Sequence, residues 1–142
     1  MLDFLFYTGI RVKELVNIKH SDYQNEQLKI LGKGNKVRYI PSSPFLEQYF
    51  QPYSNTYLFL TRNGNKLKDT QVRTIIHRKA KRAGMKKRIT PHTFRRSFAT
   101  LSNSKGIRLT TIQKLLGHSH ITTTTQYIHN DYQSIYEDYS KL

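Results

Sequence analysis

Cysteine is absent from this chain of 142 residues, which excludes disulfide bridges and thiolate metal sites. Acidic residues are scarce too, since nine Asp and Glu stand against 24 Lys and Arg and leave a formal net charge of +15. Such an excess is typical of proteins that bind polyanions, with nucleic acid the first candidate and a membrane surface the second. The lack of cysteine agrees with a reducing interior, and we expect a cytoplasmic location.

Long hydrophobic runs and linkers are also missing. The apolar start, MLDFLFYTGI, is too short to span a membrane, carries Asp3 and has no basic leader, so we interpret it as a core helix. No internal repeat, low-complexity tract or Gly/Ser linker interrupts the chain. With 37% hydrophobic residues, the sequence predicts a single domain over residues 1–142.

The familiar motifs of several enzyme classes are absent as well. No glycine-rich phosphate loop precedes a helix, and no serine stands in a nucleophile elbow. His118 and His120 are close together, but His92 and His129 are remote and no acidic residue or cysteine lies at ligand spacing. We therefore expect neither a metal nor a cofactor.

The stretch from residue 90 to residue 127 concentrates the candidate chemistry. Thr90 and Pro91 read as a helix N-cap and the first helical position. His92 and Arg95 then stand three residues apart on one helical face, so their side chains can reach the same target.

A second helix should follow within this stretch. It should begin near Thr110 or Thr111 and end at Gly117, which leaves His118 just beyond the helix end. Tyr127 comes nine residues later. Its buried face should contain Ile112, Leu115 and Leu116. Cationic donors, a histidine at a turn and a tyrosine together suit an anionic oxygen cluster such as a phosphodiester.

The N-terminal region predicts two helices. Residues 1–7 should form the first, Thr8 and Gly9 the break, and residues 11–18 the second. An ion pair between Arg11 and Glu14, one turn apart, could orient the guanidinium, although an arginine at a helix start is usually only solvated.

Residues 27–41 alternate apolar and polar side chains around Gly-Lys-Gly-Asn, which predicts a β-hairpin with Lys33 at its tip. Taken alone, such a lysine is most often a solvated charge. Ser43 and Pro44 should start a helix, and residues 57–60 could add a short third strand. The predicted class is α+β, mainly helical, with a small antiparallel sheet.

The next predicted helix is strongly basic. Asp69 should be its N-cap and Gly84 should end it, with Val72, Ile75, Ile76, Ala80 and Ala83 facing the core. Its outer cations could be merely solvated, but the net charge favours contact with nucleic acid. Its first turns would suit a major groove. The candidate DNA-binding residues are Lys36, Thr70, Gln71 and Arg73. A final helix over the tail should carry an apolar stripe of Ile135, Tyr136 and Tyr139.

Five segments occur in a characteristic order: YTGIRVKEL, GKGNKVRYIP, TPHTFRRSFAT, LLGHS and the tyrosine nine residues after His118. Together they resemble the catalytic domain of tyrosine recombinases, the phage integrase family, especially its Xer-like members. The resemblance implies cleavage and rejoining of a double-stranded DNA recombination site through a 3′-phosphotyrosyl intermediate, without metal or cofactor. It also implies a tetramer on DNA and a monomer or weak dimer when free, with no membrane partner.

The resemblance assigns a role to each matching position. Two arginines would hold the non-bridging phosphate oxygens, a hairpin lysine would protonate the leaving 5′ oxygen, and two histidines would assist proton transfer and bind the phosphate. Lys36 is the nearby alternative to the first hairpin lysine. The six implied catalytic residues are Arg11, Lys33, His92, Arg95, His118 and Tyr127.

Family members usually carry an N-terminal core-binding domain that closes a DNA clamp. This chain begins seven residues ahead of Thr8, so we expect that domain to be absent from it. Three alternatives remain: a DNA-binding module of the same fold with little recombination of its own, a type IB topoisomerase-like activity, and a basic RNA-binding domain.

Overall fold

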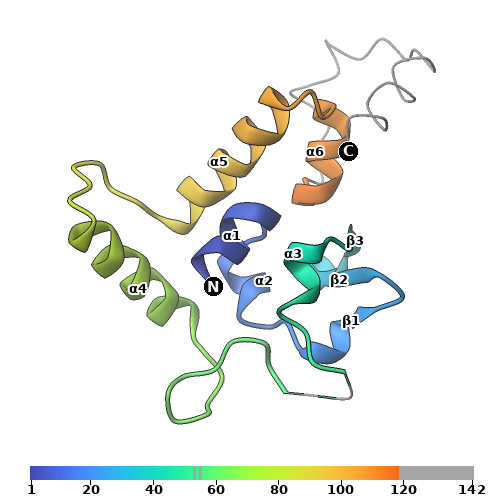
Figure 1. Cartoon of the computed structure of the whole chain (residues 1–142), viewed down its shortest axis with the longest axis horizontal. Helices are drawn as coiled ribbons and strands as arrows, with labels where there is room; N and C mark the ends of the chain where they lie inside the picture. The colour runs from blue at the N-terminus through green and yellow to red at the C-terminus, as the bar shows by residue number, and fades with distance from the viewer. Residues whose placement is uncertain (53, 55, 119–142) are drawn as a thin grey trace.

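The computed structural model describes residues 1–52, 54 and 56–118. Figure 1 shows short helices and a small sheet in the first part of the chain and longer helices after them, which confirms the α+β class. In chain order the elements are α1 (Leu2–Thr8), α2 (Val12–Leu15), η1 (His20–Asp22), β1 (Tyr23–Gln24), β2 (Gln27–Leu31), η2 (Lys33–Asn35), β3 (Val37–Pro41), α3 (Pro44–Glu47), α4 (Asp69–Arg82), α5 (Pro91–Ser104) and α6 (Leu109–Leu116).

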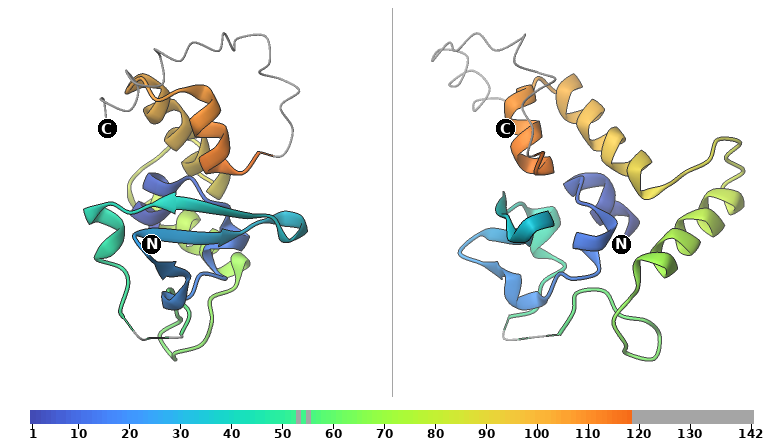
Figure 2. Two further views of the ribbon diagram at one scale, coloured as in Figure 1. Left: turned by 90° about the vertical axis from the view of Figure 1, so that its right-hand side faces the viewer. Right: turned by 180° about the vertical axis from the view of Figure 1, so that it is seen from behind.

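The predicted hairpin is confirmed. β2 and β3 pair antiparallel over residues 27–41, and Leu28 lies opposite Ile40 while Ile30 lies opposite Arg38. Leu28, Ile30 and Ile40 are buried, because alternate residues of a strand point to the same face of the sheet. Figure 2 shows the hairpin as a long two-stranded ribbon below α5 and α6.

The position of the third strand was predicted wrongly. It is β1, which pairs with β2 through a turn whose residues Asn25 and Glu26 both have positive φ, 51° and 58°. Such a turn suits the twist of a hairpin but usually contains glycine, so nothing in the residues around it predicted the turn. Residues 57–60 form only isolated bridges, between Lys19 and Tyr57 and between Leu60 and Lys66.

α1 runs through the middle of the core. Phe4 and Leu5 are fully buried, and the Phe4 ring packs edge-on against Tyr49 and Phe59. α1 ends at Gly9, whose φ of 63° is left-handed and where an added Cβ would lie 2.4 Å from Cδ1 of Phe98. Glycine therefore both stops α1 and lets α5 approach it closely.

Several predicted boundaries need correction. α2 covers Val12–Leu15 rather than residues 11–18, and its short length leaves Arg11 at the N-cap. Lys68, not Asp69, is the N-cap of α4, because the Gln71 side chain accepts a hydrogen bond from the Lys68 N–H at 2.9 Å. Ala83 is exposed instead of facing the core, since α4 ends there.

The predicted tail helix lies outside the described residues. Within the part of the chain that is described, no helix is both long and apolar enough to cross a membrane.

Candidate active site

α5 presents Arg95 to the interior of the molecule. The predicted start of this helix is confirmed: the Thr90 side chain accepts from the Thr93 N–H at 3.4 Å, and Pro91 is the first helical residue. Arg95 is only 7% exposed. Its guanidinium donates to the carbonyl oxygens of Gly9, at 2.8 Å, and Leu116, at 2.5 Å. Arg95 therefore links the end of α1 to the end of α6.

Arg11, at the start of α2, also contacts the Leu116 carbonyl group. Its backbone N–H donates to Oε2 of Glu14 at 2.8 Å, and its Nη1 pairs with Oε1 of Glu14 at 3.2 Å. The predicted ion pair is thus present. The guanidinium also makes longer contacts of 3.4 Å with the carbonyl oxygens of Leu116 and Gly117. Since the Arg11 side chain is 40% exposed, one side of this arginine pair is open to solvent.

Sequence reasoning missed a third arginine, Arg38 on β3. Its Nη1 and Nη2 donate to the two carboxylate oxygens of Glu14, each at 2.8 Å, and its Nε donates to the Leu115 carbonyl at 2.7 Å. A signal was available: the alternation that buries Ile40 puts Arg38 on the same inward face of the strand. A charged residue at an inward position needs a partner, and Glu14 supplies it.

His118 follows directly after α6, as predicted. Gly117 has a left-handed φ of 66°, its N–H donates to the Lys114 carbonyl at 3.1 Å, and the His118 N–H donates to the Gln113 carbonyl at 3.2 Å. These two bonds form a Schellman motif, which fixes where the chain leaves the helix. The backbone of His118 is thereby held beside the carbonyl groups that the arginines contact.

Partial burial and the neighbouring cations lower the pKa of His118. Burial is the largest cause, followed by repulsion from Arg95, Arg11 and Arg38 and then from His92. The two histidines and the arginines are therefore close enough to interact electrostatically. A neutral imidazole at neutral pH can accept a proton or donate its N–H to an oxygen.

The arginines also affect one another. Burial, followed by repulsion from Arg11, lowers the pKa of Arg95 to about 10, while Glu14 acts in the opposite direction. Burial raises the pKa of the Glu14 carboxyl, but the hydrogen bonds from Arg38 and Arg11 outweigh it and leave the pKa below its ordinary value. With one carboxylate among three guanidiniums, the site is cationic and suits an anion on its open side.

The hairpin places Lys33 in η2, exposed at its tip. Within the described residues, its side chain makes no hydrogen bond with the arginines. The base of the hairpin lies nearer to them, because a Cβ added at Gly32 would be 3.4 Å from Oε1 of Glu14. Lys36 is exposed as well, and its carbonyl accepts from the Gly32 N–H at 2.8 Å. The structure thus brings the hairpin to the site but does not distinguish the two lysines.

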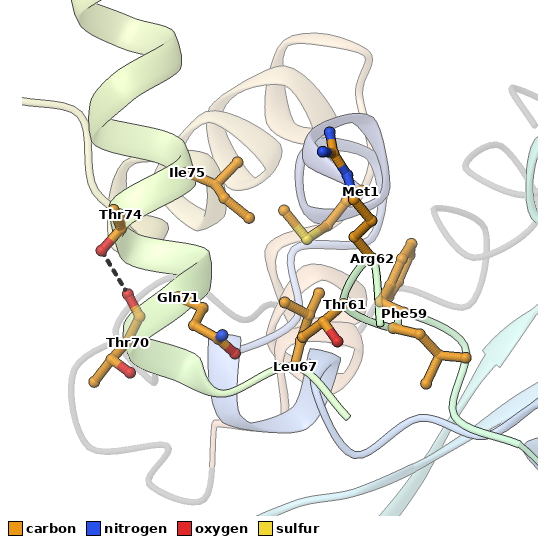
Figure 3. Close-up of a pocket in the computed structure, with 10 residues that line it drawn as sticks. Met1, Phe59, Thr61, Arg62, Leu67, Thr70, Gln71, Thr74 and Ile75 are labelled. Atoms are coloured by element: carbon orange, nitrogen blue, oxygen red, sulfur yellow. Dashed lines mark hydrogen bonds between the residues drawn. The ribbon is translucent and has the colours of Figure 1, made fainter. Parts of the chain in front are cut away.

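The predicted DNA-binding residues do not form one cluster. Figure 1 and Figure 2 place α4 and the hairpin that carries Lys36 on opposite sides of α1. Thr70 and Gln71 line a largely apolar hollow of about 580 Å³ beside Met1 and Phe59, shown in Figure 3.

Arg73 lines a different hollow. This second space, of about 300 Å³, is also lined by His77 and Arg88. Its basic lining suits a phosphate group better than the apolar hollow does. The DNA-binding roles of all four residues remain predictions.

Tyr127, the predicted nucleophile, lies outside the described residues. Among the residues that are described, no group of three His, Asp or Glu side chains could hold a metal ion.

Comparison with known proteins identifies the family. The model of the phage integrase family matches residues 1–134. The tyrosine recombinase XerC of Staphylococcus haemolyticus is 38% identical over 151 residues, which cover 98% of this chain and 51% of that protein.

Two solved structures agree with this match. The XerA recombinase is 30% identical, with a TM-score of 0.70 over 97% of this chain and 55% of that one. The XerH recombinase bound to its difH substrate is 28% identical, with a TM-score of 0.70 over 98% of this chain and 45% of that one. The chain spans about half the length of these relatives. On this evidence it belongs to the phage integrase family, as a Xer-like tyrosine recombinase catalytic domain.

Proposed function

We propose that this domain cleaves and rejoins double-stranded DNA at a recombination site through a 3′-phosphotyrosyl intermediate on Tyr127. One observation carries the proposal: the guanidiniums of Arg11 and Arg95 converge on the Leu116 carbonyl oxygen, two residues before His118. This arrangement matches the two arginines and the histidine that the family resemblance implies. Guanidiniums fixed in advance are suited to the charge that builds on phosphate oxygens during displacement.

The reaction exchanges one phosphodiester for another. The Tyr127 oxygen attacks the phosphorus and gives its proton to one of the two histidines, and the bond from phosphorus to the 5′ oxygen breaks. Lys33 supplies a proton to that oxygen, which leaves as a 5′-hydroxyl. Because one ester bond forms as another breaks, the step needs no cofactor. Attack by a 5′-hydroxyl on the phosphotyrosyl bond reverses it and rejoins the strand.

The arginines would act chiefly on the transition state. Arg11 and Arg95 would hold the two non-bridging oxygens, whose charge increases when phosphorus is pentacoordinate. Nearby guanidiniums also favour the tyrosinate anion over the phenol, whose ordinary pKa is about 10. His92 and His118 would divide proton transfer and phosphate binding between them.

The partner we propose is a double-stranded DNA site. The net charge of +15 supports DNA binding, and the relative XerH was solved with its difH substrate. We propose a monomer or weak dimer in free solution and a tetramer on DNA, to be checked by light scattering with and without a DNA site. A cytoplasmic location remains a prediction.

A covalent trapping experiment tests this function. The protein is mixed in EDTA with a nicked suicide substrate, and we expect a protein–DNA adduct that survives denaturation. Tyr127→Phe should abolish the adduct, whereas the matched variant Tyr132→Phe should retain it. An adduct that persists in Tyr127→Phe would remove Tyr127 from this role.

Two other outcomes point to the alternatives. DNA binding without any wild-type adduct would indicate a DNA-binding module of the same fold. Relaxation of supercoiled plasmid without sequence preference would indicate a topoisomerase-like activity.

A further inference from the structure

We propose that Arg38 is a positioning residue for DNA cleavage, which fixes the Arg11 guanidinium through Glu14 and the end of α6 through the Leu115 carbonyl. The inference rests on the proposed function, because it names a residue that prepares the same site. Neither the family resemblance nor the sequence pattern assigned Arg38 a role.

The first contact is a bidentate ion pair. Both carboxylate oxygens of Glu14 accept from Arg38 at 2.8 Å, which is the parallel geometry that a guanidinium forms with a carboxylate. The two side chains are 12% and 5% exposed, so little water competes with them. The Glu14 carboxylate is therefore fixed in position and orientation.

Arg11 depends on that carboxylate. Glu14 accepts from the Arg11 backbone N–H at 2.8 Å and pairs with its Nη1 at 3.2 Å. The other Arg11 contacts, to carbonyl groups of Leu116 and Gly117, are long at 3.4 Å. Since the Arg11 side chain is also 40% exposed, Glu14 provides its firmest anchor. A displaced Glu14 would release the guanidinium into several rotamers.

The second contact holds the end of α6. Arg38 Nε donates to the Leu115 carbonyl at 2.7 Å, and the next two carbonyl groups, of Leu116 and Gly117, accept from Arg95 and Arg11. The last carbonyl groups of a helix lack intrahelical partners and carry partial negative charge, so guanidiniums satisfy them well. Three successive carbonyl groups just before His118 thus accept from three different arginines.

Packing at Gly117 shows how closely Arg38 approaches. A Cβ added at Gly117 would lie 2.9 Å from Nη1 of Arg38 and 3.1 Å from its Cδ. Glycine is therefore required at this position both by its positive φ and by the approach of the arginine.

Arg38 itself does not have the features of a catalytic residue. Its Nε and both terminal nitrogens already donate to protein oxygens, and its side chain is largely covered. Stability does not by itself explain why the pair is present, because apolar side chains that replace both partners of a buried ion pair often cost no stability. A lysine could not reach Glu14 and Leu115 with the same fork of donors.

The test compares two substrates in single-turnover cleavage. One carries the normal phosphodiester, and the other carries a methylphosphonate at the scissile position. A methyl group in place of a non-bridging oxygen removes the anionic charge that Arg11 and Arg95 stabilise. Arg38→Met should slow cleavage of the phosphodiester by roughly 100-fold, as expected when a catalytic group is misplaced by about 1 Å. Cleavage of the methylphosphonate should fall much less.

Two further variants complete the design. Arg38→Lys keeps the charge but not the fork, so it should fall between wild type and Arg38→Met on the phosphodiester. Arg62→Met, which removes an exposed arginine that lines the hollow beside Met1 and Phe59 rather than the arginine site, should cleave both substrates like wild type. Circular dichroism checks folding, and Arg38→Lys provides the test if Arg38→Met does not fold.

Two results would overturn the proposal. An equal loss on both substrates would mean that Arg38 supports only the fold. Rescue of Arg38→Met by a 5′-bridging phosphorothiolate, whose leaving group needs no proton, would mean that Arg38 acts through Lys33.

The proposal can fail separately from the proposed function. If wild-type protein forms no adduct, the proposed function fails, and NMR of the Arg11 guanidinium then decides the positioning role. Arg38→Lys should shift and broaden the Arg11 side-chain signals, and unchanged signals would overturn the role.

Discussion

The molecule has two groups of cations that differ in how far they are buried and in whether they have hydrogen-bond partners. In the site, Arg95 is 7% exposed and Arg38 has a side chain that is 12% exposed, and both donate to defined oxygens. On the outer face of α4, the cations are exposed and, within the described residues, have no hydrogen-bond partner. They are Arg73, His77, Arg78, Lys79, Lys81 and Arg82.

We infer that this difference separates the cations used in chemistry from those used in binding. Burying a guanidinium is unfavourable unless partners compensate, and a fixed group is most useful where charge appears only in the transition state. An exposed cation stays hydrated, so it costs little free energy of desolvation, and it attracts the DNA backbone without a fixed geometry. We therefore expect substitutions in the site to reduce the rate of cleavage and substitutions on α4 to reduce affinity.

We expect Arg95→Ala to cause the greatest loss of cleavage. Losing one fixed donor to the developing charge should slow single-turnover cleavage by about 1000-fold, with DNA binding changed little. The matched control is Arg96→Ala, the next residue of α5, which is exposed and should keep most of its cleavage rate. If Arg95→Ala weakened binding as much as it slowed cleavage, the comparison between the two groups would break down.

Glu14→Ala tests how much the ion pairs of Glu14 with Arg38 and Arg11 contribute to stability. It leaves Arg38 and Arg11 without their carboxylate and should lower the free energy of unfolding by about 3 kcal/mol, measured by urea denaturation. The control, Glu47→Ala, removes an exposed carboxylate and should cost less than about 0.5 kcal/mol.

The pH dependence of the same variant has a definite sign. Because the pKa of Glu14 is lowered in the folded state, its stabilisation is present above its unfolded-state pKa. That contribution is lost as the pH falls through the folded-state pKa. Acidification should therefore destabilise wild type more than Glu14→Ala, and parallel curves for the two proteins would contradict the role of Glu14.

Lys33→Ala tests an intermediate case, because Lys33 is exposed like the α4 cations but is proposed to take part in the cleavage reaction. Cleavage should slow by about 100-fold, and a 5′-bridging phosphorothiolate substrate should restore it, since the thiolate leaves without a proton. Lys36→Ala should instead lower the affinity for DNA and leave the cleavage rate largely unchanged. A larger rate loss for Lys36→Ala would reverse the assignment within the hairpin.

The smallest effect is expected on α4. Arg73→Ala should weaken DNA binding by less than about tenfold and reduce the salt slope of the binding constant by about 1. At saturating DNA, the cleavage rate should stay at the wild-type value. A fluorescence anisotropy titration at several salt concentrations measures both quantities, and an unchanged slope would exclude Arg73 as a phosphate contact.

Local signals in the sequence predicted the helix boundaries around the site. Thr90 and Pro91 gave the start of α5, and Gly117 gave the end of α6, because caps depend on one or two residues. The third strand could not be predicted in the same way. The Asn25-Glu26 turn that creates β1 lacks glycine, and the apolar run at residues 57–60 resembles a strand although only its Leu58 and Phe59 pack on the core.

The amino-acid sequence alone was enough to predict the fold class, the hairpin, the helix caps around the site and, through the order of its motifs, the family. Only the tertiary structure showed that Arg38 binds Glu14, which lies 24 positions away, and that Arg95 reaches Gly9 across 86 positions. Caps and alternation are set by neighbouring residues, whereas the partners of a buried charge are set by how separate elements pack. Because desolvation makes an unpaired guanidinium unfavourable, a buried arginine is stable only where the packing of the elements brings a partner to it. That packing involves several elements at once, so it cannot be predicted from single residues.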